Sequence, residues 1–118
     1  RAGAPAHADL GDTMARAIKA PKARTPEQCL VLEQLPNVGP AMAGDLRLLG
    51  IHQPADLGGC DAFALYRQLE RATGKRQDPC VLDTFMAIVD FMQGAEPRPW
   101  WAYTAQRKAL HGQVAPGS

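Results

Sequence analysis

Several features are scarce in this chain of 118 residues, and each scarcity excludes a class of protein. Aromatic residues make up 6% of the sequence, so aliphatic side chains and alanine must fill most of the core. No apolar run approaches the about 20 residues needed to span a bilayer. We find no signal-peptide pattern, in which a positively charged region and an apolar region precede a cleavage site of small residues. We therefore expect neither membrane association nor a secretory signal.

Cysteine is also scarce, and catalytic patterns are missing. The three cysteines are an odd number, lie far apart, and form no Cys-x-x-Cys pair. This arrangement favours reduced thiols in a cytoplasmic protein over a disulfide framework, a zinc site or any other metal site. No Ser-His-Asp, paired-carboxylate or Walker-type arrangement occurs, so we expect a non-enzymatic protein with no catalytic residues and no cofactor.

A large net charge is absent, because the formal value is +1. Counting along the chain gives +3 for residues 1–24, −5 for residues 25–96 and +3 for residues 97–118, which sum to +1. A strong nucleic-acid binder usually carries a broad positive face, so this balance argues against tight nucleic-acid binding. The basic ends, with Lys19, Lys22, Arg24, Arg107 and Lys108, are expected to add to any such binding if they fold toward one face.

Helical periodicity is what the chain does contain, and no stretch alternates as a strand would. We expect an all-α fold of about five helices, near 27–35, 40–49, 61–73, 79–93 and 100–109. Residues 25–110 should form one domain, after a basic lead (1–24, with a short helix within 9–18) and before a flexible tail (111–118). Thr25 and Gln28 predict a capping box at the first of these helices. Asp61 and Asp78 should cap the third and fourth.

The segment 35–43 matches the helix-hairpin-helix pattern, a SAM-like unit in which Leu-Pro-Gly-Ile-Gly is followed by a small alanine. Leu35 and Val38 should fill the space between the two helices, and Ala43 should allow their close packing. Gly39 should let the backbone turn without a side chain in front of the helix amides. Asn37 replaces the usual first glycine and is expected to have positive φ, which Asn tolerates best after Gly. Asn37→Gly should then be neutral or slightly stabilising, and Asn37→Val destabilising.

Amides at the start of the second helix, with the positive end of its dipole behind them, suit a DNA phosphate. Such binding reads the backbone and not the bases. It should be weak, because Ala41 stands where DNA-binding members commonly carry Lys or Arg, and Pro40 donates no amide. A purely structural hairpin is the alternative. The expected nucleic-acid-binding residues are Asn37, Val38, Gly39, Ala41, Met42, Lys75 and Arg76.

A wider set of motifs extends beyond the hairpin: Leu49-Gly50-Ile51, Asp56-Leu57, Leu65 to Leu69, Gly74 to Leu82, and Trp100-Trp101. Together they resemble the bacterial family of pathogenicity-locus proteins, some of which are labelled mitomycin resistance proteins. The helical plan is similar to the C-terminal domain of TfoX-type competence regulators. The resemblance covers about residues 26–104. It implies a helix-hairpin-helix fold and a bacterial source, but no defined activity.

The Gly74–Cys80 segment allows two interpretations. Lys75 and Arg76 lie near a helix N-terminus and form a possible second anion site. Cys80, in the first turn of that helix, would have a lowered thiol pKa if exposed, but we expect it to be mostly buried and not catalytic. The alternative is a redox or drug-modifying thiol at Cys80.

The pair Trp100-Trp101 is equally open. It can stack on bases or on a partner, although a hydrophobic lid on the central helix explains at least one of the two rings. We therefore expect weak, non-sequence-specific DNA binding. A protein-interaction module that uses the hairpin and the tryptophan pair is the alternative.

Overall fold

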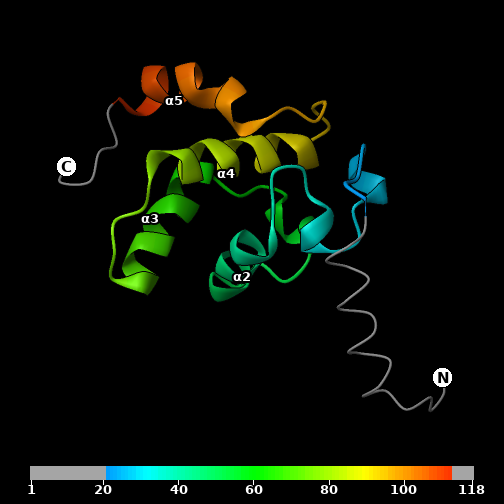
Figure 1. Ribbon diagram of the computed structural model, residues 1–118, viewed down its shortest axis with the longest axis horizontal. Coiled ribbons are helices and arrows are strands. Elements are labelled where there is room, and N and C mark those ends of the chain that lie inside the picture. Colours follow the sequence, from blue (N-terminus) through cyan, green and yellow to red (C-terminus); the bar gives the residue numbers. More distant parts are fainter. Residues whose placement is uncertain (1–20, 113–118) are drawn as a thin grey trace, which may run out of the picture.

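The structure is a computed structural model that describes residues 21–112, and this part of the chain is all-helical with no strand (Figure 1). The short helix expected within residues 9–18 lies outside the described residues. The α-helices are α2 (Pro40–Leu48), α3 (Ala62–Thr73), α4 (Pro79–Met92) and α5 (Thr104–His111). Four short 3₁₀ helices accompany them: η1 (Pro26–Gln28), η2 (Leu32–Gln34), η3 (Pro54–Leu57) and η4 (Trp100–Tyr103). The predicted all-α class is confirmed, and no described helix is long and apolar enough to cross a membrane.

The helix expected over 27–35 is wrong, because the structure has η1 and η2 with extended backbone at Cys29 and Val31 between them. Glutamine side chains compete for the backbone amides here: Gln28 Oε1 accepts from the Arg24 amide at 3.0 Å, and Gln34 Oε1 from the Leu30 amide at 2.9 Å. The buried residues Cys29, Leu32 and Leu35 recur every three positions, which suits 3₁₀ turns. The first helix of a helix-hairpin-helix unit is therefore not an α-helix in this chain.

The remaining helix signals are mostly confirmed. Asp61 caps α3, since its Oδ2 accepts from the Ala64 amide at 2.9 Å. Gly74 ends α3 in the left-handed conformation with φ 69°, where a side chain would be strained. The capping expected of two other residues is wrong: neither Thr25 nor Asp78 makes a side-chain cap bond. Pro79 at the first helical position fixes φ at the start of α4 instead.

α4 is the central helix, with α2 and α3 on one side and η4 and α5 on the other (Figure 1). All residues from Leu82 to Val89 are buried, so apolar side chains face neighbours around the whole helix. Inside this apolar setting lies one polar connection to α5. The carboxylate of Asp83, 1% exposed, accepts from Arg107 Nε at 2.6 Å and from Thr104 Oγ1 at 2.7 Å.

Candidate nucleic-acid interface

The hairpin turn (residues 35–40) connects η2 to α2. The Val38 amide donates to the Leu35 carbonyl at 3.2 Å, closing a four-residue turn with Pro36 and Asn37 in the middle. Asn37 has φ 72°, which confirms the predicted positive φ and gives this turn the sequence pattern of type II. Leu35 and Val38 are 0% and 1% exposed, so they fill the interior beneath the turn as expected.

Asn37 also makes two hydrogen bonds that no sequence pattern predicts. Its Nδ2 donates to the Arg98 carbonyl at 2.7 Å, and its Oδ1 accepts from the Trp100 amide at 3.2 Å. The partners are 61 and 63 residues away along the chain, so no pattern of neighbouring residues predicts these bonds. A glycine could make neither bond, which explains why asparagine suits this position.

The start of α2 is open in front of Gly39. This residue is exposed, and a Cβ added to it would meet no atom within 4 Å. Its φ of −97° suits any residue, so the turn itself does not require glycine. The Ala43 amide bonds to the Gly39 carbonyl, whereas the amides of Ala41 and Met42 have no backbone acceptor within residues 21–112. Ala43 is fully buried, as its predicted packing role requires.

Lys22 secures the chain leading into the turn, a contact missed by sequence reasoning. Its Nζ donates to the Glu33 carbonyl at 2.8 Å and to the Val38 carbonyl. Partial burial lowers the pKa of Lys22, and the neighbouring Cys29 and Glu33 oppose that shift. The Glu33 carboxylate is itself bonded by both terminal nitrogens of Arg47 at 3.0 Å, which holds the pKa of Glu33 below its usual range. Lys22 therefore places a cation beside the hairpin turn.

Lys75 and Arg76 are exposed in the loop between α3 and α4. They lie just before the start of α4. The hairpin turn is hydrogen-bonded to Arg98 and Trp100, which lie after the end of the same helix (Figure 1). The 14 residues of α4 span about 21 Å. The structure therefore does not combine the two predicted phosphate sites into one. Two residues of the predicted basic ends do not add to either site in the structure. Arg107 is 7% exposed and paired with Asp83, so it is unavailable to a ligand. Lys19 lies outside the described residues.

Cys80 is half-buried, where the sequence led us to expect a mostly buried thiol. Burial, together with the carboxylates of Asp78 and Asp83, raises its pKa. A helix dipole would lower the pKa of an exposed thiol at this position, but burial and the two carboxylates have the larger effect on Cys80. A raised pKa leaves the thiol protonated at neutral pH and argues against the redox or drug-modifying alternative.

Comparison with known proteins decides the family. The model of the family described as pathogenicity locus matches residues 25–109. This chain belongs to the pathogenicity locus family. A relative from Streptomyces lavendulae, named mitomycin resistance protein McrB, is 44% identical over 79 residues, which cover 67% of this chain and 75% of the relative. No solved structure matches. The resemblance inferred from the sequence motifs is confirmed.

The tryptophan pair lies within the pathogenicity locus match and next to the hairpin turn. Trp100 is half-buried and its ring meets that of Trp101 edge-on, with centroids 5.6 Å apart and an interplanar angle of 85°. Trp101 is 63% exposed. Only Trp100 is positioned to act as the hydrophobic lid. Tyr66 and Tyr103, 0% and 4% exposed, are packing residues.

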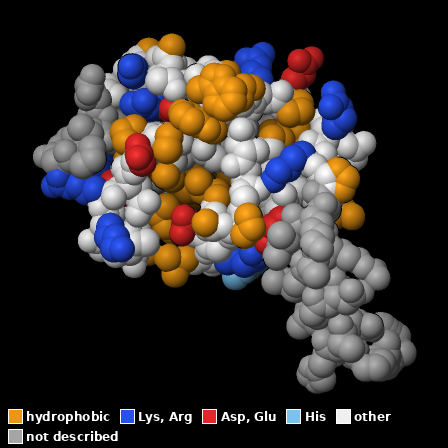
Figure 2. All heavy atoms as spheres, in the orientation of Figure 1, with side chains coloured by type: hydrophobic (Ala, Val, Ile, Leu, Met, Phe, Trp, Pro, Cys, Tyr) orange, Lys and Arg blue, Asp and Glu red, His pale blue; other side chains and the backbone are white. Residues whose placement is uncertain are grey.

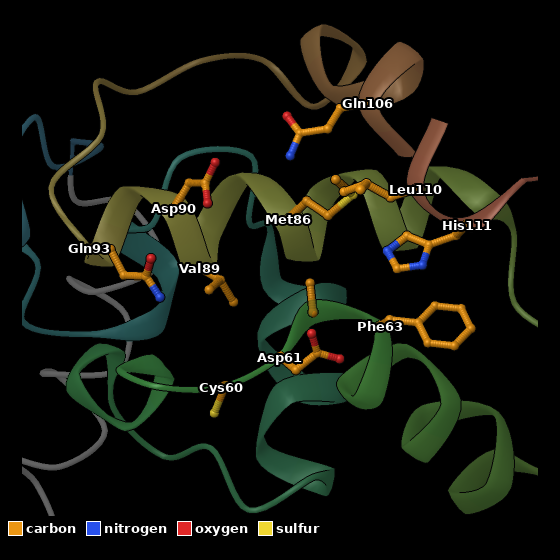
Figure 3. A pocket seen from close by; sticks show the side chains of 11 residues that line it. Cys60, Asp61, Phe63, Met86, Val89, Asp90, Gln93, Gln106, Leu110 and His111 are labelled. Atoms are coloured by element: carbon orange, nitrogen blue, oxygen red, sulfur yellow. The ribbon is translucent and has the colours of Figure 1, made fainter. Parts of the chain in front are cut away.

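A groove of about 190 Å³ lies between the start of α3, α4 and α5 (Figure 3). No sequence pattern predicted it. Its lining includes two carboxylates, Asp61 and Asp90, and no Lys or Arg. At one end the rings of Phe63 and His111 stack with centroids 4.5 Å apart. No group of three or more His, Cys, Asp or Glu residues in the described part of the chain is arranged to hold a metal ion. A negatively charged lining does not suit DNA, so the groove is separate from the candidate interface.

Proposed function

We propose that this protein is a non-enzymatic DNA-binding protein that holds phosphates weakly and without sequence preference at the hairpin turn. One observation carries the proposal: within residues 21–112 the amides of Ala41 and Met42 have no backbone acceptor, and they begin α2 beside an exposed Gly39 with open space in front of it. In this proposal the turn and α2 act as the second half of a helix-hairpin-helix unit, although an irregular segment replaces its first helix.

The chemistry follows from the helix end. The first amides of a helix point outward with the positive end of the helix dipole behind them, and an anion satisfies both. A phosphate fits this position because Gly39 offers no side chain to block its approach. Lys22, held at the Val38 carbonyl, adds a nearby positive charge. All of these groups read the phosphate backbone, which is why no base preference is expected.

The binding should be weak for two reasons. Pro40 lacks an amide and Ala41 lacks a charge, so the turn offers few donors. Lys and Arg side chains are scattered over the face shown in Figure 2 and form no continuous patch there. The expected affinity is that of non-specific binding, with Kd of about 10⁻⁴–10⁻⁶ M at physiological salt.

A pair of glycine substitutions on α2 and its cap tests the site. Gly39→Glu puts a carboxylate in front of the free amides, whereas Gly44→Glu adds the same charge within α2. An added Cβ meets no atom within 4 Å at either position. We expect Gly39→Glu to weaken DNA binding at least tenfold, because its side chain both blocks the site in front of the amides and repels a phosphate there. Gly44→Glu should weaken binding at most about threefold, because it repels the phosphate from five residues further along α2 and blocks nothing. Fluorescence anisotropy with single- and double-stranded probes at about 50 mM salt measures both.

Equal losses for the two variants would show that DNA contacts the protein elsewhere. Thermal unfolding is the folding control, and a carboxylate near the N-terminus of α2 should leave the Tm of Gly39→Glu unchanged or raised.

A protein-interaction module is the second candidate, and the exposure of Trp101 is the observation that favours it. It predicts no retention of either DNA probe at low salt, together with loss of a protein partner when Trp100 or Trp101 is replaced. Absence of binding to both probes at about 50 mM salt would favour this function over DNA binding.

A further inference from the structure

Trp101 is the largest exposed hydrophobic side chain in the described part of the chain. The other large exposed ones, Leu30, Leu48 and Leu110, belong to the stretch between η1 and η2, to α2 and to the far end of α5. Exposing most of an indole ring forgoes its burial, which is worth more than that of any aliphatic side chain. The exposed ring of Trp101 is therefore available to a ligand.

The segment that carries the ring is held in place at two points. Trp100 packs edge-on against it, and the Trp100 amide is bonded to Asn37. η4, which carries both rings, packs on α4 and continues into α5. A ring on such a support loses little freedom when a ligand stacks on it.

The exposed ring offers a small apolar surface. A tryptophan buries at most about 250 Å², and no other large exposed hydrophobic side chain of the described residues belongs to η4. A nucleobase needs only one ring face, and phosphate contacts elsewhere supply the remaining affinity.

The chain segment that carries the ring has an excess of positive charge. Residues 96–112 contain Arg98, Arg107 and Lys108 and one acidic residue, Glu96. Arg107 forms an ion pair with Asp83, whereas Arg98 and Lys108 are exposed to solvent. The hydrogen bond between Asn37 and Trp100 limits the distance between the backbones of Gly39 and Trp101 to about 20 Å, because Gly39 lies only two residues after Asn37. A short stretch of one DNA strand can cover that distance.

We propose that Trp101 stacks on an unpaired base and that the preferred ligand of this protein is single-stranded DNA. This inference rests on the proposed function, because the hairpin turn would hold a phosphate of the same strand. A duplex keeps its bases stacked inside, so it would use the hairpin turn but not Trp101.

Two single-tryptophan variants locate the stacking. Trp100→Phe retains only Trp101 and Trp101→Phe retains only Trp100. We expect a thymidine oligonucleotide of about a dozen nucleotides to quench the fluorescence of Trp100→Phe strongly, and a blunt duplex of equal length to leave it nearly unchanged. The fluorescence of Trp101→Phe should respond much less to the oligonucleotide, because the half-buried ring of Trp100 meets residue 101 only edge-on.

Affinity provides the second readout. Trp101→Ala should weaken binding of the oligonucleotide about 5- to 100-fold and binding of the duplex less than about twofold. Trp101→Phe should keep most of the affinity, since a smaller ring still stacks. The matched control is Leu110→Ala, which removes an equally exposed apolar side chain at the other end of α5 and should change neither affinity.

Each failure has a distinct meaning. Binding of both probes with no dependence on Trp101 would overturn the stacking proposal and leave the proposed function standing. Binding of neither probe would overturn both. A blue shift of Trp101 with vesicles containing anionic lipid, without any response to the oligonucleotide, would overturn the proposal in favour of a membrane surface.

Discussion

Asn37 joins two parts of the chain that are distant in sequence. Its left-handed backbone closes the hairpin turn, and its side-chain amide holds the segment of Arg98 and Trp100. These two roles have opposite consequences for a glycine replacement. Glycine relieves the cost of positive φ, but it removes both side-chain hydrogen bonds.

The hydrogen bonds reverse the expectation that sequence alone gives for Asn37→Gly. Losing two hydrogen bonds, one exposed and one partly buried, costs about 1–3 kcal/mol, which exceeds the gain of about 1 kcal/mol from easier positive φ. We therefore expect Asn37→Gly to lower the free energy of unfolding by about 1 kcal/mol. Asn37→Ala should lose more, since it keeps the strain as well. Urea unfolding measures both, and an Asn37→Gly variant more stable than the native chain would contradict this.

Cys29 and Cys80 should react slowly as thiols. Desolvation raises the pKa of Cys29 to about 11, against the opposing charge of Lys22, and burial raises that of Cys80. With a pKa of about 11, only about one thiol in a thousand is ionised at pH 8. In variants that retain one cysteine, labelling by a disulfide reagent should be slow near pH 7.5 and accelerate as pH rises. Rapid labelling of Cys80 in the folded protein at neutral pH would revive the redox hypothesis.

At the scale of elements, one buried ion pair fixes α5 on α4. Asp83 and Arg107 are 1% and 7% exposed and lie 2.6 Å apart, and Thr104 supplies a further hydrogen bond. The pair contributes to position more than to net stability, because removing two charges from water offsets much of their attraction.

Removing one partner should therefore be costly, and removing both should be less so. We expect Asp83→Ala to lower the free energy of unfolding by about 3–5 kcal/mol, because Arg107 keeps an unpaired buried charge. The double variant Asp83→Leu/Arg107→Met should recover much of that loss. Urea unfolding gives the free energies, and limited proteolysis reports release of α5. A double variant with the summed loss of the two single variants would show that the pair is not coupled.

At the scale of the whole molecule, positive charge is divided between the two ends of α4. The hairpin turn with Lys22 lies toward one end, and Lys75 with Arg76 lies at the other. Few phosphates can be held at once on such a surface. The number of phosphate contacts, about two to four on such a surface, sets how steeply salt weakens DNA binding.

Salt titration of DNA binding should therefore give a shallow slope. Each phosphate contact contributes about 0.9 to the slope of log K against log salt for a duplex, so we expect a value of about −2 to −4. Replacing Lys75 and Arg76 with glutamine should reduce its magnitude by about one to two. The charge-preserving pair Lys75→Arg and Arg76→Lys is the control and should keep the slope. An unchanged slope in the glutamine variant would remove these two residues from the interface.

The sequence by itself determined the features that depend on near neighbours along the chain. Helical periodicity and terminal signals such as Asp61 and Gly74 located α2 to α5. The turn pattern predicted positive φ at Asn37, because only the residues of the turn decide that angle. The family motifs could be recognised for the same reason, because each one is a short run of neighbouring residues.

Only the tertiary structure decided the features that depend on distant partners. Residues 27–35 have apolar positions that fit either a helix or 3₁₀ turns, and packing of Cys29, Leu32 and Leu35 against the core selected the turns. The Asn37 bonds, the Lys22 contacts and the groove beside α4 all join segments far apart in the chain. Local propensity carries no information about such pairs, because their energies exist only once the core has brought the segments together.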